Sequence, residues 1–273
     1  MTGFSELALA DRGPQGARRV HLRVPSGAPP AAGHPVLYIL DGDAARDALA
    51  GTAADVVVAA IGYDLDPESL KAARAYDYTP AIPGRPALRD PRVPAWRAGG
   101  ADALLDWIDA VVRPAVHAAA GVDRTRETLA GHSYGGLCVL HALCRAPQAY
   151  AGYLAASPSV WWYDGAILDE VTQLARAAGT RAAPARPARV LVMAGEHEAR
   201  HARAVGADGT PHSRTGGVPT LGQAQALAAR LQTIPGLCAS FEAVPGGTHA
   251  SLLDACARRA LAFAAEGRYH CRH

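Results

Sequence analysis

Three side chains of types used in nucleophilic catalysis follow short apolar runs of this sequence, in the order Ser, Glu, His. Ser133 lies within Gly131-His132-Ser133-Tyr134-Gly135, between two apolar segments. Glycines at positions 131 and 135 allow a tight strand-to-helix turn, which exposes the serine hydroxyl as a nucleophile. Since Gly-x-Ser-x-Gly also arises by chance in a chain with 28 glycines, its surroundings must decide whether Ser133 is catalytic.

A candidate acid and a candidate base come later in the chain. Gly195-Glu196-His197-Glu198 follows one apolar run, and Gly246-Gly247-Thr248-His249 follows another. Catalytic groups gather where parallel strands end, so we expect both segments near Ser133. His249 would take the serine proton as general base and return it to the leaving alkoxide, while a carboxylate fixes its tautomer. We favour Glu198 over Glu196 as that carboxylate, because the acid of such enzymes commonly sits three residues after the glycine that ends its strand.

The tetrahedral oxyanion of ester hydrolysis needs hydrogen-bond donors that are already in place. The backbone N–H of Tyr134, directly after the nucleophile, is one candidate. The turn Asp41-Gly42-Asp43 offers the second at Gly42, where the missing side chain allows close backbone approach.

These residues need a scaffold in which strands and helices alternate. Such alternation predicts an α/β fold with a mostly parallel central sheet and helices on both faces, built as one domain over residues 1–273. The apolar periodicity predicts strands at 18–25, 35–40, 55–61, 128–130, 153–156, 189–194 and 239–244, and helices at 101–120, 135–144, 167–178, 221–231 and 250–265.

Two irregular segments flank the expected site. Residues 78–100 contain five prolines and residues 204–220 are rich in glycine. Long loops inside a compact domain commonly act as lids or binding loops, and we predict that role for both.

Composition excludes several classes of function. A net charge of +2 without a basic stripe gives no support for nucleic acid binding. No window is apolar enough to span a membrane, and residues 1–16 lack the apolar stretch of a signal peptide, so we expect a cytoplasmic protein. Five cysteines without Cys-x-x-Cys spacing favour buried thiols over a disulfide framework or a zinc ribbon. The oligomeric state is left open.

Several further blocks resemble a known family. They are Tyr38-Ile39-Leu40-Asp41-Gly42, Ile61-Gly62-Tyr63, Arg74 before Asp77-Tyr78-Thr79-Pro80, Gly99-Gly100-Ala101, and Ser157-Pro158-Ser159 followed by Trp161-Trp162. Together with Gly131–Gly136 they make the chain similar to the esterase branch of the α/β-hydrolases that contains the enterobactin and salmochelin trilactone esterases. The Asp-Tyr-Thr-Pro and Ser-Pro-Ser blocks are the most specific.

The resemblance implies an α/β-hydrolase fold and ester hydrolysis through Ser133 and His249, without a cofactor. It also implies that Arg74, Tyr78, Trp161 and Trp162 contact an anionic aryl or catecholate ligand. Some members of this branch are described as using a Ser-His dyad, which leaves the role of Glu198 open.

A metal motif overlaps the candidate acid. His197-Glu198-Ala199-Arg200-His201 matches His-Glu-x-x-His, which on a helix would hold zinc between the two histidines. We favour a chance match, because the segment abuts a strand end and the extended pattern would need glycine where Ala204 stands.

We therefore predict a serine carboxylesterase that hydrolyses ester or lactone bonds through an acyl-enzyme, with a catecholate trilactone siderophore as its small-molecule substrate. The sequence leaves open whether the ferric or the iron-free siderophore is preferred. A general short-chain ester or thioester hydrolase, or an acyltransferase, is the alternative. A zinc hydrolase through His197, Glu198 and His201, or a non-catalytic binding protein on this fold, fits the sequence less well.

Overall fold

A single mixed β-sheet organises the computed structural model, which describes residues 3–13, 17–180, 184, 186–199 and 219–266. Within these residues the strand order is β1-β2-β4-β3-β5-β6-β7-β8. Only β1 and β2 run antiparallel to their neighbours. The strands are β1 (Ser5–Glu6), β2 (Arg18–Arg23), β3 (His34–Leu40), β4 (Val57–Tyr63), β5 (Val122–His132), β6 (Gly152–Ala156), β7 (Ala188–Gly195) and β8 (Leu237–Val244).

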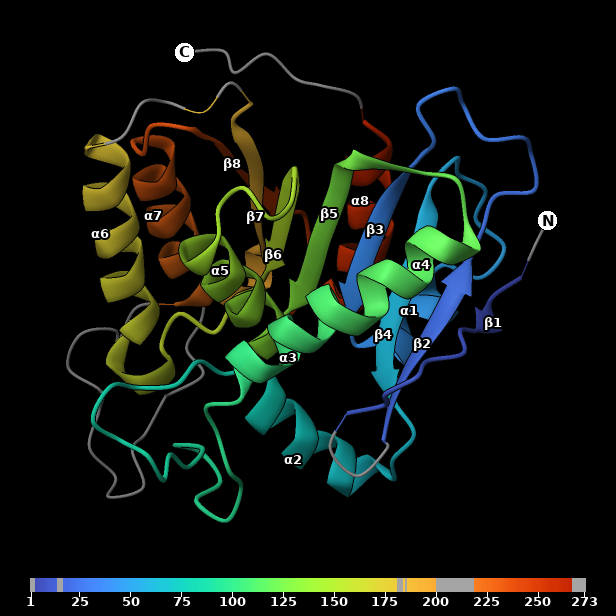
Figure 1. Ribbon diagram of the computed structural model, residues 1–273. Helices are drawn as coiled ribbons and strands as arrows, with labels where there is room; N and C mark the ends of the chain where they lie inside the picture. The colour runs from blue at the N-terminus through green and yellow to red at the C-terminus, as the bar shows by residue number, and fades with distance from the viewer. Residues whose placement is uncertain (1–2, 14–16, 181–183, 185, 200–218, 267–273) are drawn as a thin grey trace.

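Helices cover both faces of this sheet (Figure 1). They are α1 (Gly42–Ala48), α2 (Pro67–Asp77), α3 (Ala101–Trp107), α4 (Arg113–Ala119), α5 (Tyr134–Arg145), α6 (Ala166–Gly179), α7 (Thr220–Gln232) and α8 (Leu252–Ala265). A π-helical turn, Ile108–Val112, joins α3 to α4, and 3-10 turns lie at Trp162–Asp164 and Glu196–Ala199.

Side-chain alternation along the strands divides the core into two layers. In β3, Tyr38 and Leu40 pack with α3, α5, α6 and α7, while Leu37 and Ile39 pack with α1 and α8 on the other face. Because both faces are covered, β3 and β4 are buried along their whole length. This arrangement confirms the predicted α/β fold.

The predicted strands and the later helices are all present, with boundaries shifted by a few residues. Strand β5 is the largest difference, since it begins six residues before the predicted 128–130 segment. The predicted helix at 101–120 is interrupted by the π-helical turn. Helices α1 and α2 were not predicted.

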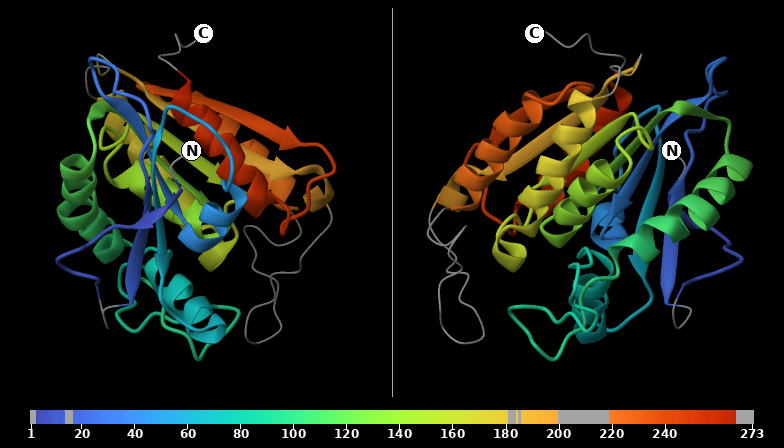
Figure 2. Two further views of the ribbon diagram at one scale, coloured as in Figure 1. Left: turned by 90° about the vertical axis from the view of Figure 1, so that its right-hand side faces the viewer. Right: turned by 60° about the vertical axis from the view of Figure 1, so that its left-hand side comes forward.

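The proline-rich segment 78–100 lies with α2 beyond the carboxyl ends of the parallel strands, as Figures 1 and 2 show from several sides. It is irregular apart from one antiparallel bridge between Arg89 and Arg97. Residues 204–218, most of the second predicted lid, lie outside the described residues. A lid role for either segment remains a prediction.

The described cysteines differ in burial and in whether they are free thiols or disulfide-bonded. Cys138 and Cys256 are buried free thiols, and Cys144 is a partly buried one. Cys238 of β8 is disulfide-bonded, so the expectation of buried thiols does not extend to it. Burial raises the pKa of the Cys138, Cys144 and Cys256 thiols, which leaves them protonated and unreactive.

Candidate active site

The nucleophile candidate occupies a strained turn between β5 and α5. Ser133 has φ 59° and ψ −114°, a conformation that non-glycine residues rarely adopt. A side chain at Gly131 would place its Cβ 2.6 Å from the backbone carbon of Gly135, so the turn closes only because residue 131 is a glycine. Such strain is typical of a serine held clear of the sheet as a nucleophile.

Ser133, His249 and Glu198 form a continuous hydrogen-bonded chain. His249 Nε2 lies 3.0 Å from Ser133 Oγ, and His249 Nδ1 lies 2.7 Å from Glu198 Oε2. The imidazole is half exposed, whereas the carboxylate is 5% exposed. The structure thus brings together the three side chains that the sequence placed after three different strands.

Glu198 is held by two further donors. Its Oε1 accepts the hydroxyl of Ser157 at 2.6 Å and the backbone N–H of Gly195 at 2.9 Å. Burial raises the pKa of the Glu198 carboxyl, but the hydrogen bonds from His249, Ser157 and Gly195 outweigh it and leave the pKa below its ordinary value. The acid is therefore an anion at neutral pH.

The Ser-Pro-Ser block carries two side chains whose part in the site the sequence reasoning missed. Ser157, fully buried after β6, binds Glu198, and Ser159 Oγ lies 3.4 Å from Ser133 Oγ. The backbone N–H of Ser159 also donates to the Ser133 carbonyl at 3.2 Å. The signal was available, because polar residues directly after a parallel strand are expected at the site.

The loops that carry the acid and the base are tied together. The N–H of His197 donates to Gly247 O at 2.9 Å, and Glu196 Oε2 accepts the N–H of Gly246 at 3.0 Å. A Cβ on Gly195 would lie 2.3 Å from Gly247 O, so only glycine permits this approach. Glu196, which we did not favour as the acid, thus accepts a hydrogen bond from the loop that leads to His249.

The two oxyanion candidates begin helices next to one another. Gly42 is the first residue of α1 and Tyr134 the first of α5, and first-turn N–H groups have no acceptor within their own helix. Ile39 of β3 pairs with Ala130 of β5. Gly42 and Ser133 each lie three residues beyond this pair, so they follow neighbouring strands at the same level of the sheet. A Cβ on Gly42 would meet the Ala60 backbone at 2.5 Å, which explains the glycine.

The four predicted substrate contacts do not share one environment. Tyr78 and Trp162 are fully buried, so neither side chain exposes a surface to a ligand, and their substrate-binding role stays a prediction that the burial does not support. Arg74 is paired with the Asp41 carboxylate. Trp161 is partly exposed, as Arg74 is, and its ring lies 6.0 Å from that of Tyr134.

The proline-rich segment reaches this aromatic pair. Asp90, almost fully buried, accepts the Tyr134 hydroxyl at 2.5 Å. Arg92, half exposed, lies over the rings of Tyr134 and Trp161, 4.5 and 5.1 Å from their centroids. Residues 78–100 therefore pack directly against the residue that follows the nucleophile.

The zinc motif overlaps this site only in part. His201 lies outside the described residues, and the turn before it already commits Glu198 to His249 and Ser157. Among the described residues, no group of three His, Cys, Asp or Glu side chains is placed to hold a metal ion.

No described helix is long and apolar enough to cross a bilayer.

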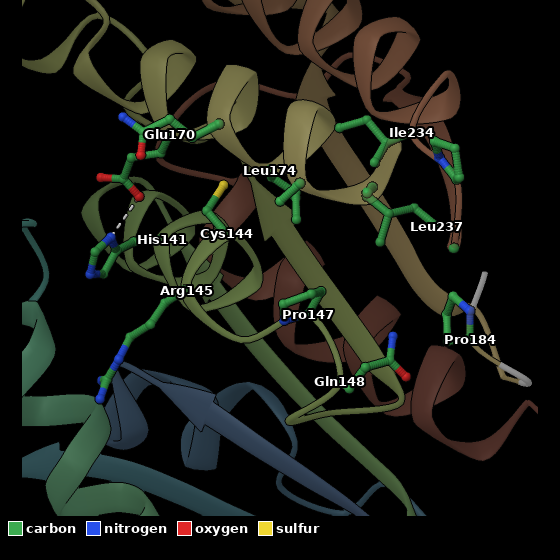
Figure 3. A pocket seen from close by; sticks show the side chains of 15 residues that line it. His141, Cys144, Arg145, Pro147, Gln148, Glu170, Leu174, Pro184, Ile234 and Leu237 are labelled. Atoms are coloured by element: carbon green, nitrogen blue, oxygen red, sulfur yellow. Dashed lines mark hydrogen bonds and ion pairs between the residues drawn. The ribbon is translucent and has the colours of Figure 1, made fainter. Parts of the chain in front are cut away.

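A cavity of about 550 Å³ lies away from this site, between the C-terminal halves of α5 and α6 and the start of β8 (Figure 3). Its lining includes Leu174, Ile234 and Leu237 on one side and the hydrogen-bonded pair His141 and Glu170 on another. Neither Ser133 nor His249 contributes to it. The catalytic candidates lie at the opposite, carboxyl edge of the sheet.

Several known proteins are similar to this chain in sequence. The siderophore triacetylfusarinine C esterase of Aspergillus fumigatus is 40% identical over 148 residues, 50% of this chain and 48% of that protein. The apo-salmochelin esterase of Escherichia coli is 35% identical over 162 residues, 56% of this chain and 50% of that protein. The chain thus matches about half the length of these relatives. The ferri-bacillibactin esterase BesA of Bacillus subtilis is 28% identical over 283 residues, 96% of this chain and 89% of that protein.

Solved structures share the fold. The BES protein from Bacillus cereus superposes with a TM-score of 0.76 at 22% identity, covering 98% of this chain and 97% of that one. The siderophore hydrolase EstA from Aspergillus nidulans gives 0.72 at 24% identity, covering 96% and 93%. These likenesses confirm the α/β-hydrolase architecture. The sequence profile of the family described as "Putative esterase" matches residues 13–250, and the chain therefore belongs to that esterase family.

Proposed function

We propose that this protein is a serine esterase that opens the ester bonds of a trilactone siderophore of the catecholate class through an acyl-enzyme. The observation that carries the chemistry is the hydrogen-bonded chain from Ser133 through His249 to Glu198. The substrate class is supported by the relatives, which are named as esterases of triacetylfusarinine C, ferri-bacillibactin, enterobactin and apo-salmochelin.

The reaction follows from the positions of these groups. Ser133 Oγ attacks the ester carbonyl while His249 Nε2 takes its proton, and the N–H groups of Gly42 and Tyr134 stabilise the oxyanion. The tetrahedral intermediate expels the alkoxide, which receives the proton from His249. Water, deprotonated by His249, then attacks the acyl-serine, and the second tetrahedral intermediate releases the carboxylic acid as Ser133 Oγ takes the proton back from His249. Glu198 stabilises the imidazolium in both halves.

A product assay tests this function. The purified protein is incubated separately with apo-enterobactin, ferric enterobactin, triacetylfusarinine C, a simple aryl ester and an aryl phosphonate, and linear fragments, the released phenol and serine labelling are followed, with Ser133→Ala as the control. We expect linear products from a catecholate trilactone and none from Ser133→Ala. Turnover of simple aryl esters alone would favour a general short-chain esterase, and absence of all turnover together with no labelling by an aryl phosphonate would favour a binding protein.

A further inference from the structure

Arg74 and Tyr78, which the sequence suggested as ligand contacts, both bind the turn that carries Gly42. Arg74 donates from Nε and Nη2 to the two carboxylate oxygens of Asp41, at 2.5 and 2.9 Å. Tyr78 accepts the backbone N–H of Asp41 at its hydroxyl, at 3.2 Å. One residue, directly before the oxyanion candidate, is thus held at its side chain and at its backbone.

Asp41 needs such support because its backbone is in the left-handed region. Its φ of 58° and ψ of 47° are uncommon for a residue with a Cβ, although Asp tolerates them better than most. Its side chain is 9% exposed, and a buried carboxylate is costly unless it is paired. The two-pronged contact with Arg74 supplies both the charge and the fixed geometry.

The residues that bind Asp41 lie on a part of α2 that is itself bound to the sheet. Arg74 and Tyr78 lie one turn apart at the end of α2, with the Arg74 guanidinium 5.5 Å from the centre of the Tyr78 ring. Between them, Asp77 forms a buried ion pair with Arg18 of β2 and accepts the hydroxyl of Tyr63 of β4. The end of α2 is therefore anchored to the sheet rather than free to follow a ligand.

Asp41 also lies near the nucleophile turn. A Cβ added at Gly135 would lie 3.5 Å from Leu40 Cβ and 3.7 Å from Asp41 Oδ2. The Asp41 turn and the Ser133 turn are therefore neighbours, and a shift of one changes its alignment with the other. Gly42, between Asp41 and α1, would move with Asp41.

From these contacts we propose that Arg74 and Tyr78 are positioning residues, which fix the Asp41–Gly42 turn so that the Gly42 N–H points at the oxyanion. This inference rests on the proposed esterase function. It replaces the expectation that Arg74 binds an anionic substrate group. It also gives the Arg-x-x-Asp-Tyr block at 74–78 a physical role, since Arg74, Asp77 and Tyr78 connect the oxyanion turn to the sheet.

The two roles of Arg74 predict different kinetics. A positioning residue acts on the transition state, so its loss lowers kcat for every ester, whereas a ligand contact raises KM for anionic esters only. We would measure kcat and KM for two aryl esters with the same leaving group, one with a neutral and one with a carboxylate-bearing acyl chain. The variants are Tyr78→Phe, which removes one hydroxyl, and Arg74→Lys, which keeps the charge but loses the two-pronged contact.

For both variants we expect kcat to fall about 10- to 100-fold on both esters, with KM within about twofold, because complete loss of an oxyanion donor typically costs 10²- to 10³-fold. The rate of phosphonylation of the serine should fall in parallel. Tyr76→Phe is the matched control on the same helix, where the ring packs against Gly100, and it should keep wild-type kinetics. Tyr78→Phe keeps the test decisive if Arg74→Lys does not fold.

An unchanged kcat in folded Tyr78→Phe, or a rise in KM confined to the anionic ester in Arg74→Lys, would overturn the inference while leaving the esterase function intact. Failure of the wild-type protein to hydrolyse either ester or to react with the phosphonate would instead remove the proposed function, and this inference with it.

Discussion

At the scale of single residues, the candidate site depends on a buried carboxylate that is held as an anion. Glu198 accepts hydrogen bonds from His249, Ser157 and Gly195, so its lone pairs are directed and its charge is balanced. A carboxylate in this position keeps the imidazole in the tautomer that presents Nε2 as a base to the serine. The geometry therefore favours a triad over a dyad.

The matched variants Glu198→Gln and Glu196→Gln test that preference. Glu198→Gln keeps the shape of the side chain but removes the charge, and we expect kcat to fall about 10³-fold or more, as when the acid of a triad is neutralised. Glu196→Gln removes an exposed charge but keeps an oxygen that can accept the Gly246 N–H, so it should leave kcat within about threefold. The measurement is steady-state hydrolysis of a neutral aryl ester, and a near-normal rate for Glu198→Gln would show that a dyad suffices.

His132 provides a prediction about pH. Burial and the neighbouring His249 lower the pKa of His132 from 6.5 to about 4, and Nε2 of this ring is buried without a hydrogen-bond partner among the residues that the structure describes. The unfolded chain therefore binds a proton near pH 6.5 that the folded protein takes up only near pH 4, so acidification through this window favours unfolding. From the two pKa values we expect a loss of about 2 kcal/mol between pH 7.5 and pH 5.

Urea denaturation of wild type and His132→Asn at both pH values isolates this contribution. The variant should lose about 2 kcal/mol less than wild type on going from pH 7.5 to pH 5, whatever its stability at pH 7.5. Equal losses in the two proteins would mean that His132 is not kept neutral by its surroundings.

At the scale of elements, the segment 78–100 is attached to the start of α5. The Asp90 carboxylate accepts the Tyr134 hydroxyl through one oxygen and the N–H groups of Arg92 and Val93 through the other. Tyr163 adds a hydrogen bond from its hydroxyl to the Arg89 carbonyl. Leu88 and Ala98 of the same segment are buried in the core, so polar contacts with α5 and apolar packing together fix the loop next to the nucleophile turn.

Tyr134→Phe should loosen this loop without unfolding the domain. The substitution keeps the ring under Arg92 but leaves a buried carboxylate oxygen of Asp90 without its donor, at a cost of about 1–3 kcal/mol. We expect trypsin to cleave after Arg89, Arg92 and Arg97 several times faster than in wild type, with little change in the rate elsewhere in the chain. An unchanged digestion pattern would mean that the Tyr134–Asp90 bond does not hold the segment.

The sequence allowed the catalytic elements to be predicted for a clear reason. Ser133, Glu198 and His249 follow strands of the parallel part of the sheet, and parallel strands bring their carboxyl ends together whatever the details of packing. Helix α2 was missed although Asp66 before Pro67 is an N-cap signal, and its side chain does accept two backbone N–H groups.

The predicted ligand contacts could not be decided from the sequence, because burial is a tertiary property. Nothing in the residue types of Tyr78 and Trp162 distinguishes an aromatic ring that lines a pocket from one that fills the core, and both are fully buried. Arg74 could likewise be assigned only once Asp41 was seen beside it.

At the scale of the whole molecule, one end of the sheet carries the candidate active site, and the other carries a buried polar cluster that stabilises the fold. The site occupies the carboxyl end, where several turns are strained, whereas a buried polar cluster near the other end ties β3, β5 and α4 together. Its centre is Glu127 of β5, which is 1% exposed. Tyr38 donates to it at 2.9 Å, His117 Nε2 lies 2.7 Å away, and Arg113 pairs with its second oxygen.

Glu127→Gln separates stability from catalysis, because Glu127 and Ser133 lie six residues apart along an extended strand, about 20 Å. Neutralising Glu127 leaves the Arg113 guanidinium partly buried without its main partner, and breaking a buried ion pair typically costs about 3–5 kcal/mol. We therefore expect the free energy of unfolding in urea to fall by about 3 kcal/mol or more, while kcat of the folded enzyme stays within about twofold. Asp109→Asn is the control, since that carboxylate contacts the same Arg113 at 3.0 Å but is 46% exposed, and its loss should cost less than about 1 kcal/mol. Equal destabilisation by the two variants, or a large loss of kcat in Glu127→Gln, would contradict this division between the ends of the sheet.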